Sequence, residues 1–386
     1  MKRLTYIIIG TLFTLSINAQ KLKTVHSIVK EVQSEEWYLE QAELWKKEIK
    51  KNKKNGTAWY NYYSAYRALK NLNWDEKIVF EKYIKICNEI ADDAYKAIPK
   101  TFEGNHIVWW NSGNNPDKIE FLNRAYKYAP DNPRVIIDKL TLMELNNEHQ
   151  TDEFSSLCKE YYRTNEISSG IYNWAYNILS ELPQDAVIFT AGDNDTYSLW
   201  IIQQEKNYRK DVTIINTSLI LRDDYRKKVF EDLKWAPFEK DMEACKTREE
   251  YHTTRKELFE HMFTEGMDQT YVSVSAIGHF SEDFNDQLHL IGLSYKYSLE
   301  SFDNLSLMVR NYEKKYLLDY LSEQFEHHIS AGVDDQFKAL YLPLMTKLYK
   351  HYVAAEQNNN ASELKKLLTS IAEKNGKTEE ILPLFD

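Results

Sequence analysis

Two carboxylates and an amide stand side by side in the segment Gly192-Asp193-Asn194-Asp195-Thr196. Asp193 and Asp195 have the Asp-x-Asp spacing at which carboxylate oxygens hold a divalent cation, and a pair of carboxyl groups can also divide acid and base roles. A bare helix N-terminus favours anions, but two carboxylates repel them. The spacing therefore favours a metal, an amine or sugar hydroxyls over a phosphate. The competing hypothesis is structural: Asp195 or Asn194 caps the next helix, which accounts for only one carboxylate.

A strand, a turn and a helix must position these residues. Residues 186–191 form an unbroken apolar run typical of a buried parallel strand. Gly192 can adopt the positive φ that a tight turn often needs, and a helix is predicted over 196–206. A second apolar run at 211–216 completes a β-α-β crossover. Ligands of open α/β sheets bind at the carboxyl ends of strands. His289, on a later predicted strand that could end nearby, joins the candidates for ligand binding. The candidate ligand-binding residues are therefore Asp193, Asn194, Asp195, Thr196 and His289. No catalytic residue is assigned.

The remaining periodicity predicts a mainly helical α/β fold, in which tetratricopeptide-like helical repeats flank a small Rossmann-like parallel-sheet domain. Between residues 35 and 182 apolar side chains recur at helical spacing, as in Trp59, Tyr62, Tyr63 and Tyr66. The endings A-Y-K-A-I-P (94–99) and A-Y-K-Y-A-P (125–130) resemble the close of a tetratricopeptide repeat, but no third copy keeps the period of ~34 residues. An irregular stack of helical hairpins is the safer interpretation.

Four regions follow from this periodicity. Strands are also predicted at 271–276 and 289–295, with helices at 222–234 and 246–264, and the chain becomes helical again from 305. The expected regions are a signal peptide at 1–19, a tetratricopeptide-like helical region at 20–182, an α/β domain at 183–304 and a C-terminal helical region at 305–386.

The N-terminus resembles an export signal. Lys2 and Arg3 precede an apolar run, and Ala19 stands before Gln20 at a plausible cleavage point. The run at 4–17 is shorter than the ~20 residues that span a bilayer, which argues against an uncleaved anchor. The prediction is a periplasmic or secreted protein, cleaved near Ala19/Gln20, without a membrane span after cleavage.

Composition restricts the partners. The net charge of −10 argues against nucleic acid, because phosphate contacts need a basic surface. The basic cluster at 46–54 is interpreted as a solvated helix face. A protein or glycan partner is expected, no cofactor is firmly implied, and a divalent cation at Asp193 and Asp195 stays open.

Other reactive side chains are scattered. Trp109-Trp110 could form an aromatic platform for a sugar, although packing anchors are the commoner role of such a pair. The adjacent His327 and His328 point about 100° apart on a helix and cannot share one metal. Motifs of zinc proteases, α/β-hydrolases, P-loop proteins and dinucleotide-binding enzymes are missing from the sequence. The three cysteines allow at most one disulfide, and none is assigned. They are Cys87, Cys158 (expected to fill core space) and Cys245.

The central segment resembles a known family. V-I-F-T-A-G-D-N-D-T-Y-S-L-W (187–200) is similar to F-T-N-G-D-N-D-T-F-P-L-W, a motif of the soluble, membrane-distal part of bacterial polytopic proteins resembling protein O-mannosyltransferases. Y-R-K-D-V (208–212) with N-T-S-L (216–219) resembles the family's R-P-D-V…N-x-S-L, and H-L-I-G-L-S-Y-K (289–296) its L-E-G-L-A-Y-R. The match covers about 181–300. Ser198 and Ala191 replace the family's Pro and Asn.

The resemblance implies an accessory domain of a glycosylation-linked family, without the polytopic membrane region in which such transferases carry their catalytic carboxylates and donor site. The first expectation is therefore an exported, non-catalytic binding protein. The alternative is a carbohydrate-active enzyme, transferase- or hydrolase-like, that uses Asp193 and Asp195 with a divalent metal. A purely structural scaffold differs from the first only in lacking a small ligand.

Overall fold

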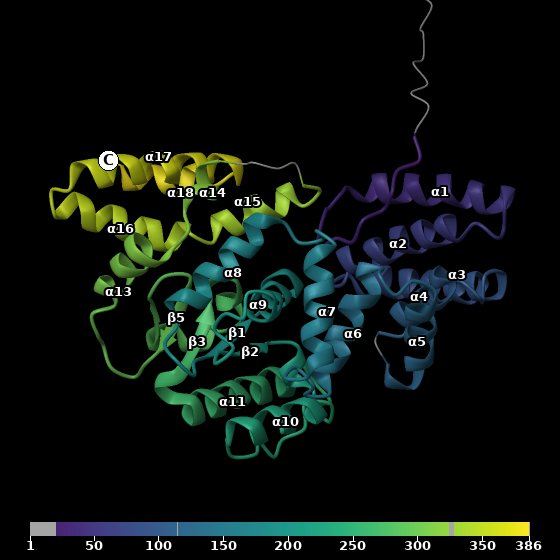
Figure 1. Ribbon diagram of the computed structural model, residues 1–386, viewed down its shortest axis with the longest axis horizontal. Helices are drawn as coiled ribbons and strands as arrows, with labels where there is room; N and C mark the ends of the chain where they lie inside the picture. The colour runs from purple at the N-terminus through teal and green to yellow at the C-terminus, as the bar shows by residue number, and fades with distance from the viewer. Residues whose placement is uncertain (1–20, 114, 324–327, 386) are drawn as a thin grey trace, which may run out of the picture.

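A computed structural model describes residues 21–113, 115–323 and 328–385, so the predicted signal peptide lies outside the described residues. It shows a mainly helical α/β protein with one small sheet, as the periodicity predicts (Figure 1). The N-terminal helices are α1 (Glu35–Lys51), α2 (Gly56–Leu72), α3 (Lys77–Ala97), α4 (Phe102–Asn111), α5 (Ile119–Tyr128), α6 (Pro133–Leu145), α7 (Asp152–Arg163) and α8 (Ser169–Glu181).

The central part alternates strands with helices. Its elements are β1 (Val187–Thr190), α9 (Asp193–Glu205), β2 (Thr213–Asn216), α10 (Asp223–Leu233), α11 (Arg248–Gly266), β3 (Thr270–Ser273), a 3-10 helix (Val274–His279), α12 (Ser281–Phe284), β4 (Leu288–Leu290) and β5 (Ser294–Tyr297). The C-terminal helices are α13 (Asn304–Arg310), a π-helical turn (Asn311–Lys315), α14 (Asp319–Ser322), α15 (Ala331–Ala339), α16 (Leu342–Ala354), α17 (Asn358–Lys374) and α18 (Thr378–Ile381).

The N-terminal helices form a stack in which consecutive helices pack on one another, seen at the right of Figure 1. The predicted aromatic stripe of α2 is confirmed, because Tyr63 is completely buried and Trp59 and Tyr62 are nearly so. α6 begins at Pro133 with Asn132 as its N-cap, and the Asn132 side chain accepts a hydrogen bond from the backbone N–H of Arg134.

The sheet has five strands in the order β2-β1-β3-β5-β4. β1 pairs in parallel with β2 and β3, but β5 runs antiparallel to both β3 and β4. The expectation of a wholly parallel sheet is thus corrected to a mixed one. The predicted strand at 289–295 is instead a hairpin, and its short turn forces β4 and β5 to be antiparallel.

The turn of this hairpin needs a glycine. A Cβ atom on Gly292 would collide with the carboxylate of Glu181 and the hydroxyl of Tyr316, which both approach the backbone there. The apolar character of 289–295 hides the turn from a periodicity argument, because its two neighbours in the turn, Ile291 and Leu293, are buried.

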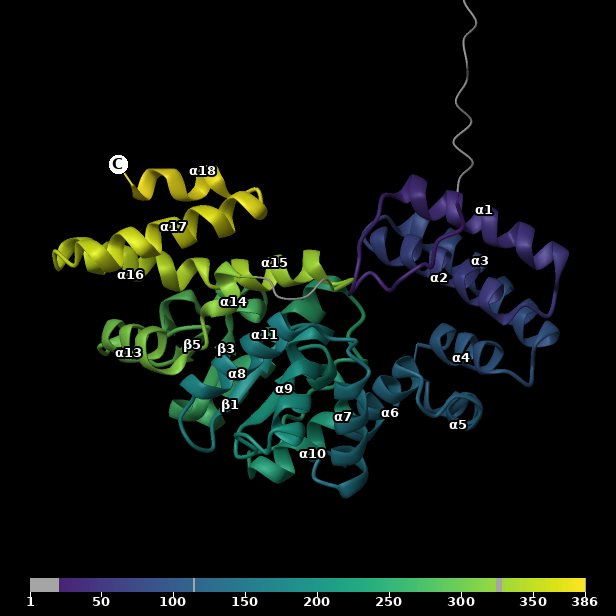
Figure 2. The same cartoon turned by 45° about the horizontal axis from the view of Figure 1, so that its top comes forward.

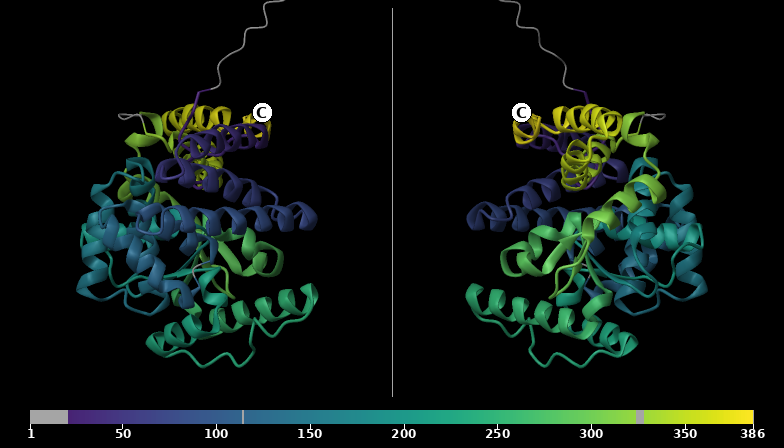
Figure 3. Two further views of the ribbon diagram at one scale, coloured as in Figure 1. Left: turned by 90° about the vertical axis from the view of Figure 1, so that its right-hand side faces the viewer. Right: turned by 90° about the vertical axis from the view of Figure 1, so that its left-hand side faces the viewer.

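Helices cover both faces of the sheet, giving three layers (Figures 1 and 3). Side chains of successive strand residues alternate between faces. Ile188 and its face join the core formed with α8 and α9, whereas Phe189 and its face pack on α10 and α11. Phe189 lies against Phe263 of α11 with ring centroids 5.8 Å apart.

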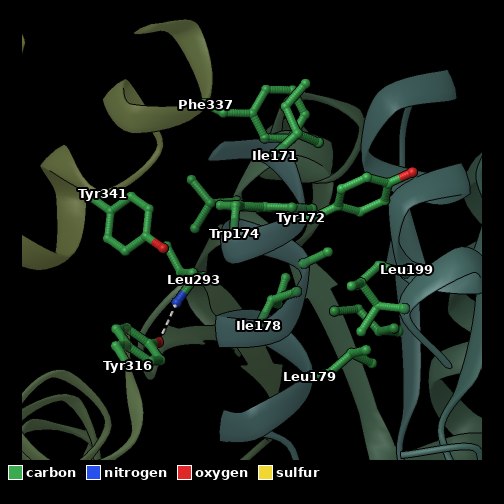
Figure 4. Packing of buried hydrophobic residues seen from close by; sticks show 14 of the residues in the cluster. Ile171, Tyr172, Trp174, Ile178, Leu179, Leu199, Leu293, Tyr316, Phe337 and Tyr341 are labelled. Carbon is green, nitrogen blue, oxygen red and sulfur yellow. Dashed lines mark hydrogen bonds between the residues drawn. The ribbon is translucent and has the colours of Figure 1, made fainter. Parts of the chain in front are cut away.

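The C-terminal helices share their core with the sheet. In Figure 4, Trp174 of α8 lies with Phe337 of α15 on one side and Leu199 of α9 further along the same core. The Trp174 and Phe337 rings meet edge to face at 4.9 Å. Figure 2 shows the C-terminal helices and the N-terminal stack flanking the α/β layers as two separate arms.

Cys158 is completely buried and fills core space as predicted, and Cys87, Cys158 and Cys245 are all free thiols. Across the described parts of the chain, every helix is too short or too polar to cross a membrane.

Candidate functional site

The strand-to-helix turn at Gly192 holds the candidate residues at the carboxyl end of β1. α9 begins at Asp193, three residues earlier than predicted, so Asp193, Asn194 and Asp195 form its first turn. The N-cap is Gly192 rather than Asn194 or Asp195, and its φ of −122° is not the positive value expected. Gly192 has extended backbone because the Asp195 side chain folds back over the turn and accepts hydrogen bonds from the backbone N–H groups there.

The carboxylate of Asp195 is surrounded by hydrogen-bond donors. Its Oδ1 accepts from the backbone N–H of Gly192 (2.7 Å) and of Thr196 (3.0 Å). Its Oδ2 accepts from the backbone N–H of Ala191 (2.9 Å) and from the hydroxyl of Ser275 (2.6 Å). The residue is 3% exposed. Burial raises the pKa of Asp195, and the hydrogen bonds from Ser275, Ala191 and Gly192 lower it.

Thr196 extends this network to the neighbouring strand. Its hydroxyl lies 2.7 Å from that of Thr190 at the end of β1 and accepts from the Asn216 side chain at 2.9 Å. Asn216, the last residue of β2, also accepts from the backbone N–H groups of Ser218 and Leu219. Asn216 and Ser275 belong to the site but were not among the predicted site residues. Asn216 ends the predicted strand at 211–216 and could have been found for that reason, whereas Ser275 lay inside the predicted strand at 271–276, which in the structure ends at Ser273.

Asp193 and Asn194 face outward, toward the N-terminal part of the chain. The Asn194 side chain donates to the backbone carbonyl of Val29 at 2.8 Å. Asp193 is exposed, and the described residues give it no hydrogen bond. Displacement of bulk water by the surrounding protein raises the pKa of Asp193, and Arg67 of α2 lowers it. Asp193 therefore lies within the electrostatic reach of α2, where the helical stack meets the sheet edge.

The facing side of this junction is a cluster of aromatic and cationic side chains on α2, α4 and α6. The Arg67 guanidinium lies 4.3 Å from the ring centre of Trp110, and that of Arg134 lies 4.6 Å from the ring centre of Tyr60 and 5.5 Å from that of Trp110. Arginine over an aromatic face is a favourable arrangement. Trp110 is half-buried, while Trp109 is a buried packing anchor.

A buried polar chain supports this cluster. The Tyr60 hydroxyl lies 2.8 Å from Nδ1 of His106, and Nε2 of His106 lies 3.0 Å from Oδ2 of Asp138. Burial lowers the pKa of His106 and raises that of Tyr60 to about 12. With both groups neutral, Nε2–H donates to Asp138 and Nδ1 accepts from Tyr60. Sequence periodicity could not find this chain, because its members lie on three separate helices.

His289 lies away from the turn. It is on β4, three strands from β1, which corresponds to about 14 Å at ordinary strand spacing. Its Nε2 lies 3.3 Å from the carbonyl of Ser298, and its ring packs edge to face with Phe302. The structure thus brings Asp193, Asn194, Asp195 and Thr196 together without His289.

The two carboxylates of the turn, Asp193 and Asp195, differ in whether a ligand can reach them. Both oxygens of Asp195 accept hydrogen bonds, and only Asp193 faces solvent. Within the described ranges, no group of three or more His, Cys, Asp or Glu side chains is arranged to hold a metal ion.

Comparison with known proteins supplies the family. The family described as TMEM260-associated domain 2 matches residues 171–380, which run from the start of α8 through the sheet to α18 and make up more than half of the chain. No curated protein matches the chain. The matched region contains both the turn at Asp195 and the C-terminal helices that share its core. The chain belongs to the family of TMEM260-associated domain 2, a domain of glycosylation-linked membrane proteins.

Proposed function

We propose that the protein is exported and acts by binding a glycan or protein partner, without catalysing a reaction, as an accessory component of glycosylation. Membership of the TMEM260-associated domain 2 family supports the link to glycosylation. The observation that carries the non-catalytic part is the state of Asp195. Its carboxylate is buried and accepts four hydrogen bonds within the fold. A carboxylate so occupied is poorly suited to bind metal or transfer a proton.

The proposed binding surface is the junction between the helical stack and the sheet edge, which we define by Asp193, Arg67, Trp110 and Arg134. It offers one carboxylate, two guanidinium groups and an aromatic face, all at least partly exposed. Such a set provides hydrogen bonds and stacking for a polar partner, as glycans and polar protein surfaces require.

A thermal-shift series on the protein beginning at Gln20 tests this proposal. Mg²⁺, Mn²⁺ and Ca²⁺ should leave the melting temperature unchanged, whereas a mannose-containing oligosaccharide or a glycosylated peptide should raise it. Arg67→Ala should abolish the second effect, and Arg248→Ala, on an exposed position of α11, should preserve it. A metal-induced shift that is lost in both Asp193→Asn and Asp195→Asn would contradict the proposal and show a metal site at the turn, as the alternative of a metal-dependent enzyme requires. No shift with any ligand would contradict both.

The proposed export has its own test. The full chain produced in a Gram-negative host should be recovered from the periplasm or the medium with Gln20 as its first residue, measured by intact mass. A cytoplasmic product that retains residues 1–19 would contradict it.

A further inference from the structure

A second concave region lies along the free edge of the sheet, toward the amino end of β2 and away from Asp195. It is a cavity of about 830 Å³ between β2 and the helices α6, α7, α9 and α10. Cavities of roughly 300–1,000 Å³ are the usual size of small-molecule sites. Five elements from distant parts of the sequence enclose it, so it is a product of the tertiary fold.

A buried carboxyl group lines this cavity. Glu144 of α6 is 4% exposed, and its Oε1 accepts a hydrogen bond from the hydroxyl of Tyr225 at 2.5 Å. Its Oε2 lies 3.7 Å from Nδ1 of His149, which is too long for a hydrogen bond. In the described structure no donor lies within hydrogen-bond distance of Oε2, and Nδ1 of His149 is buried without a hydrogen-bond partner. A buried polar atom without a partner is costly, so a ligand that pairs with Nδ1 of His149 would offset that cost, and Oε2 of Glu144 is available to the same ligand.

The edge of β2 adds backbone groups to the same wall. The N–H of Thr213 donates to Ala186 and that of Thr217 to Thr190, so these residues turn their polar groups toward β1. In a parallel ladder the alternate residue turns its N–H and C=O the other way. Ile214 is the alternate residue, so its N–H and C=O point away from β1. Because β2 is the edge strand, no strand pairs with Ile214 on that side, where the residue lines the cavity.

Charges of both signs act on Glu144. Burial raises the pKa of Glu144, His149 and the hydrogen bond from Tyr225 lower it, and Asp232 of α10 raises it further. Asp232 is at the exposed rim, where it accepts from the Asn147 side chain at 2.6 Å. Asp211 is paired with Arg209. Lys210 is the one lysine or arginine among the described residues that line the cavity.

We propose that this cavity binds a small organic cation, a primary amine that also carries hydroxyl groups. The ammonium group would donate to Oε2 of Glu144 and be attracted by Asp232, and a hydroxyl would pair with the free backbone groups of Ile214. An anionic ligand is disfavoured, because it would meet Glu144 and Asp232. The proposal is independent of the partner surface at Asp193, since the two sites lie at opposite ends of the sheet.

Isothermal titration calorimetry with glucosamine tests the proposal. Glucosamine should bind, while glucose and N-acetylglucosamine, which have no ammonium group, should bind at least about tenfold more weakly. Glu144→Gln should weaken glucosamine binding about tenfold or more, and Asp232→Asn several-fold. Glu249→Gln, an exposed carboxylate of α11, should leave it unchanged.

The proposal would be overturned if glucose and glucosamine bound equally, or if Glu144→Gln bound glucosamine as well as the wild type does. It would also be overturned if glucosamine did not bind at concentrations up to about 50 mM, at which a Kd in the millimolar range would be detected. Asp232→Asn alters only an exposed side chain, so it gives a second result if Glu144→Gln fails to fold. Failure here would leave the glycan or protein partner at the Arg67 surface unaffected.

Discussion

At the scale of single residues, the turn divides two similar carboxylates between different tasks. Asp195 joins the end of β1, the start of α9 and the segment after β3 through its four hydrogen bonds. Asp193, two positions earlier, is exposed and makes no hydrogen bond within the described residues. An isosteric change should therefore be costly at one position and nearly neutral at the other.

We expect Asp195→Asn to lower the free energy of unfolding by about 2–4 kcal/mol, because an amide placed at either oxygen turns a donor toward the donors already present. Asp193→Asn should change it by less than about 0.5 kcal/mol, as for other exposed sites. Urea unfolding followed by circular dichroism measures both. Equal stability of the two variants would contradict the structural role of Asp195.

At the scale of elements, the last residue of α8 connects three segments. The carboxyl group of Glu181 accepts from the backbone N–H of Leu293 (2.9 Å), from the hydroxyl of Ser294 (2.5 Å) and from that of Tyr316. These donors lie in the β4–β5 hairpin and just after the π-helical turn. Figure 4 shows Leu293 and Tyr316 beside α8. Burial, opposed by these hydrogen bonds, raises the pKa of Glu181 to about 7.

The raised pKa makes stability depend on pH. The folded state keeps the proton of Glu181 at pH values where the unfolded chain, with the ordinary value of 4.5, has lost it. The stabilising contribution is therefore complete below about pH 4.5 and is lost as pH rises to about 7, by up to about 3 kcal/mol. Urea unfolding at pH 5 and pH 8 should show this loss in the wild type and a smaller one in Glu181→Gln.

Glu373→Gln, an exposed carboxylate of α17, is the matched control and should behave as the wild type. A Glu181→Gln profile parallel to that of the wild type would mean that Glu181 does not titrate in this range.

At the scale of the whole molecule, the segment before α1 joins the N-terminal stack to the α/β layers. Its Val29 carbonyl accepts from Asn194 at the sheet edge, and Lys30 forms an ion pair with Glu166 between α7 and α8. Burial and the nearby Arg134 lower the pKa of Lys30 to about 8. These contacts lie beside the proposed partner surface and fix how the stack faces Asp193.

We expect Asn194→Ala to loosen this connection. Amide hydrogen exchange in residues 21–33 should become faster, by up to about fivefold for the loss of about 1 kcal/mol, while exchange in β1 and β3 stays unchanged. Mass spectrometry of peptic peptides measures it. Asn285→Ala, at an exposed position, is the control. Unchanged exchange in 21–33 would show that the Asn194 contact does not hold the segment.

Local periodicity and the chemistry of turns predict most of the helices, the buried strands β1 and β2, and the position of the acidic turn. The resemblance to a glycosylation-linked family of membrane proteins agrees with the family match over residues 171–380. The mixed sheet was decided by the hairpin at Gly292, whose need for glycine comes from Glu181 and Tyr316, distant in sequence.

Which of the two carboxylates is accessible to a ligand depends on contacts between segments that are distant in the sequence. The spacing of Asp193 and Asp195 gives no reason to separate their roles. In the folded protein the donor from Ser275 helps to make Asp195 structural, whereas Asp193 stays exposed near Arg67 of α2. The cavity at Glu144 is likewise beyond sequence reasoning, because its wall comes from five elements and its unpaired atoms exist only once those elements have packed. Hydrogen bonds and burial between distant segments leave no local periodic pattern in the sequence, so they are visible only in the folded structure.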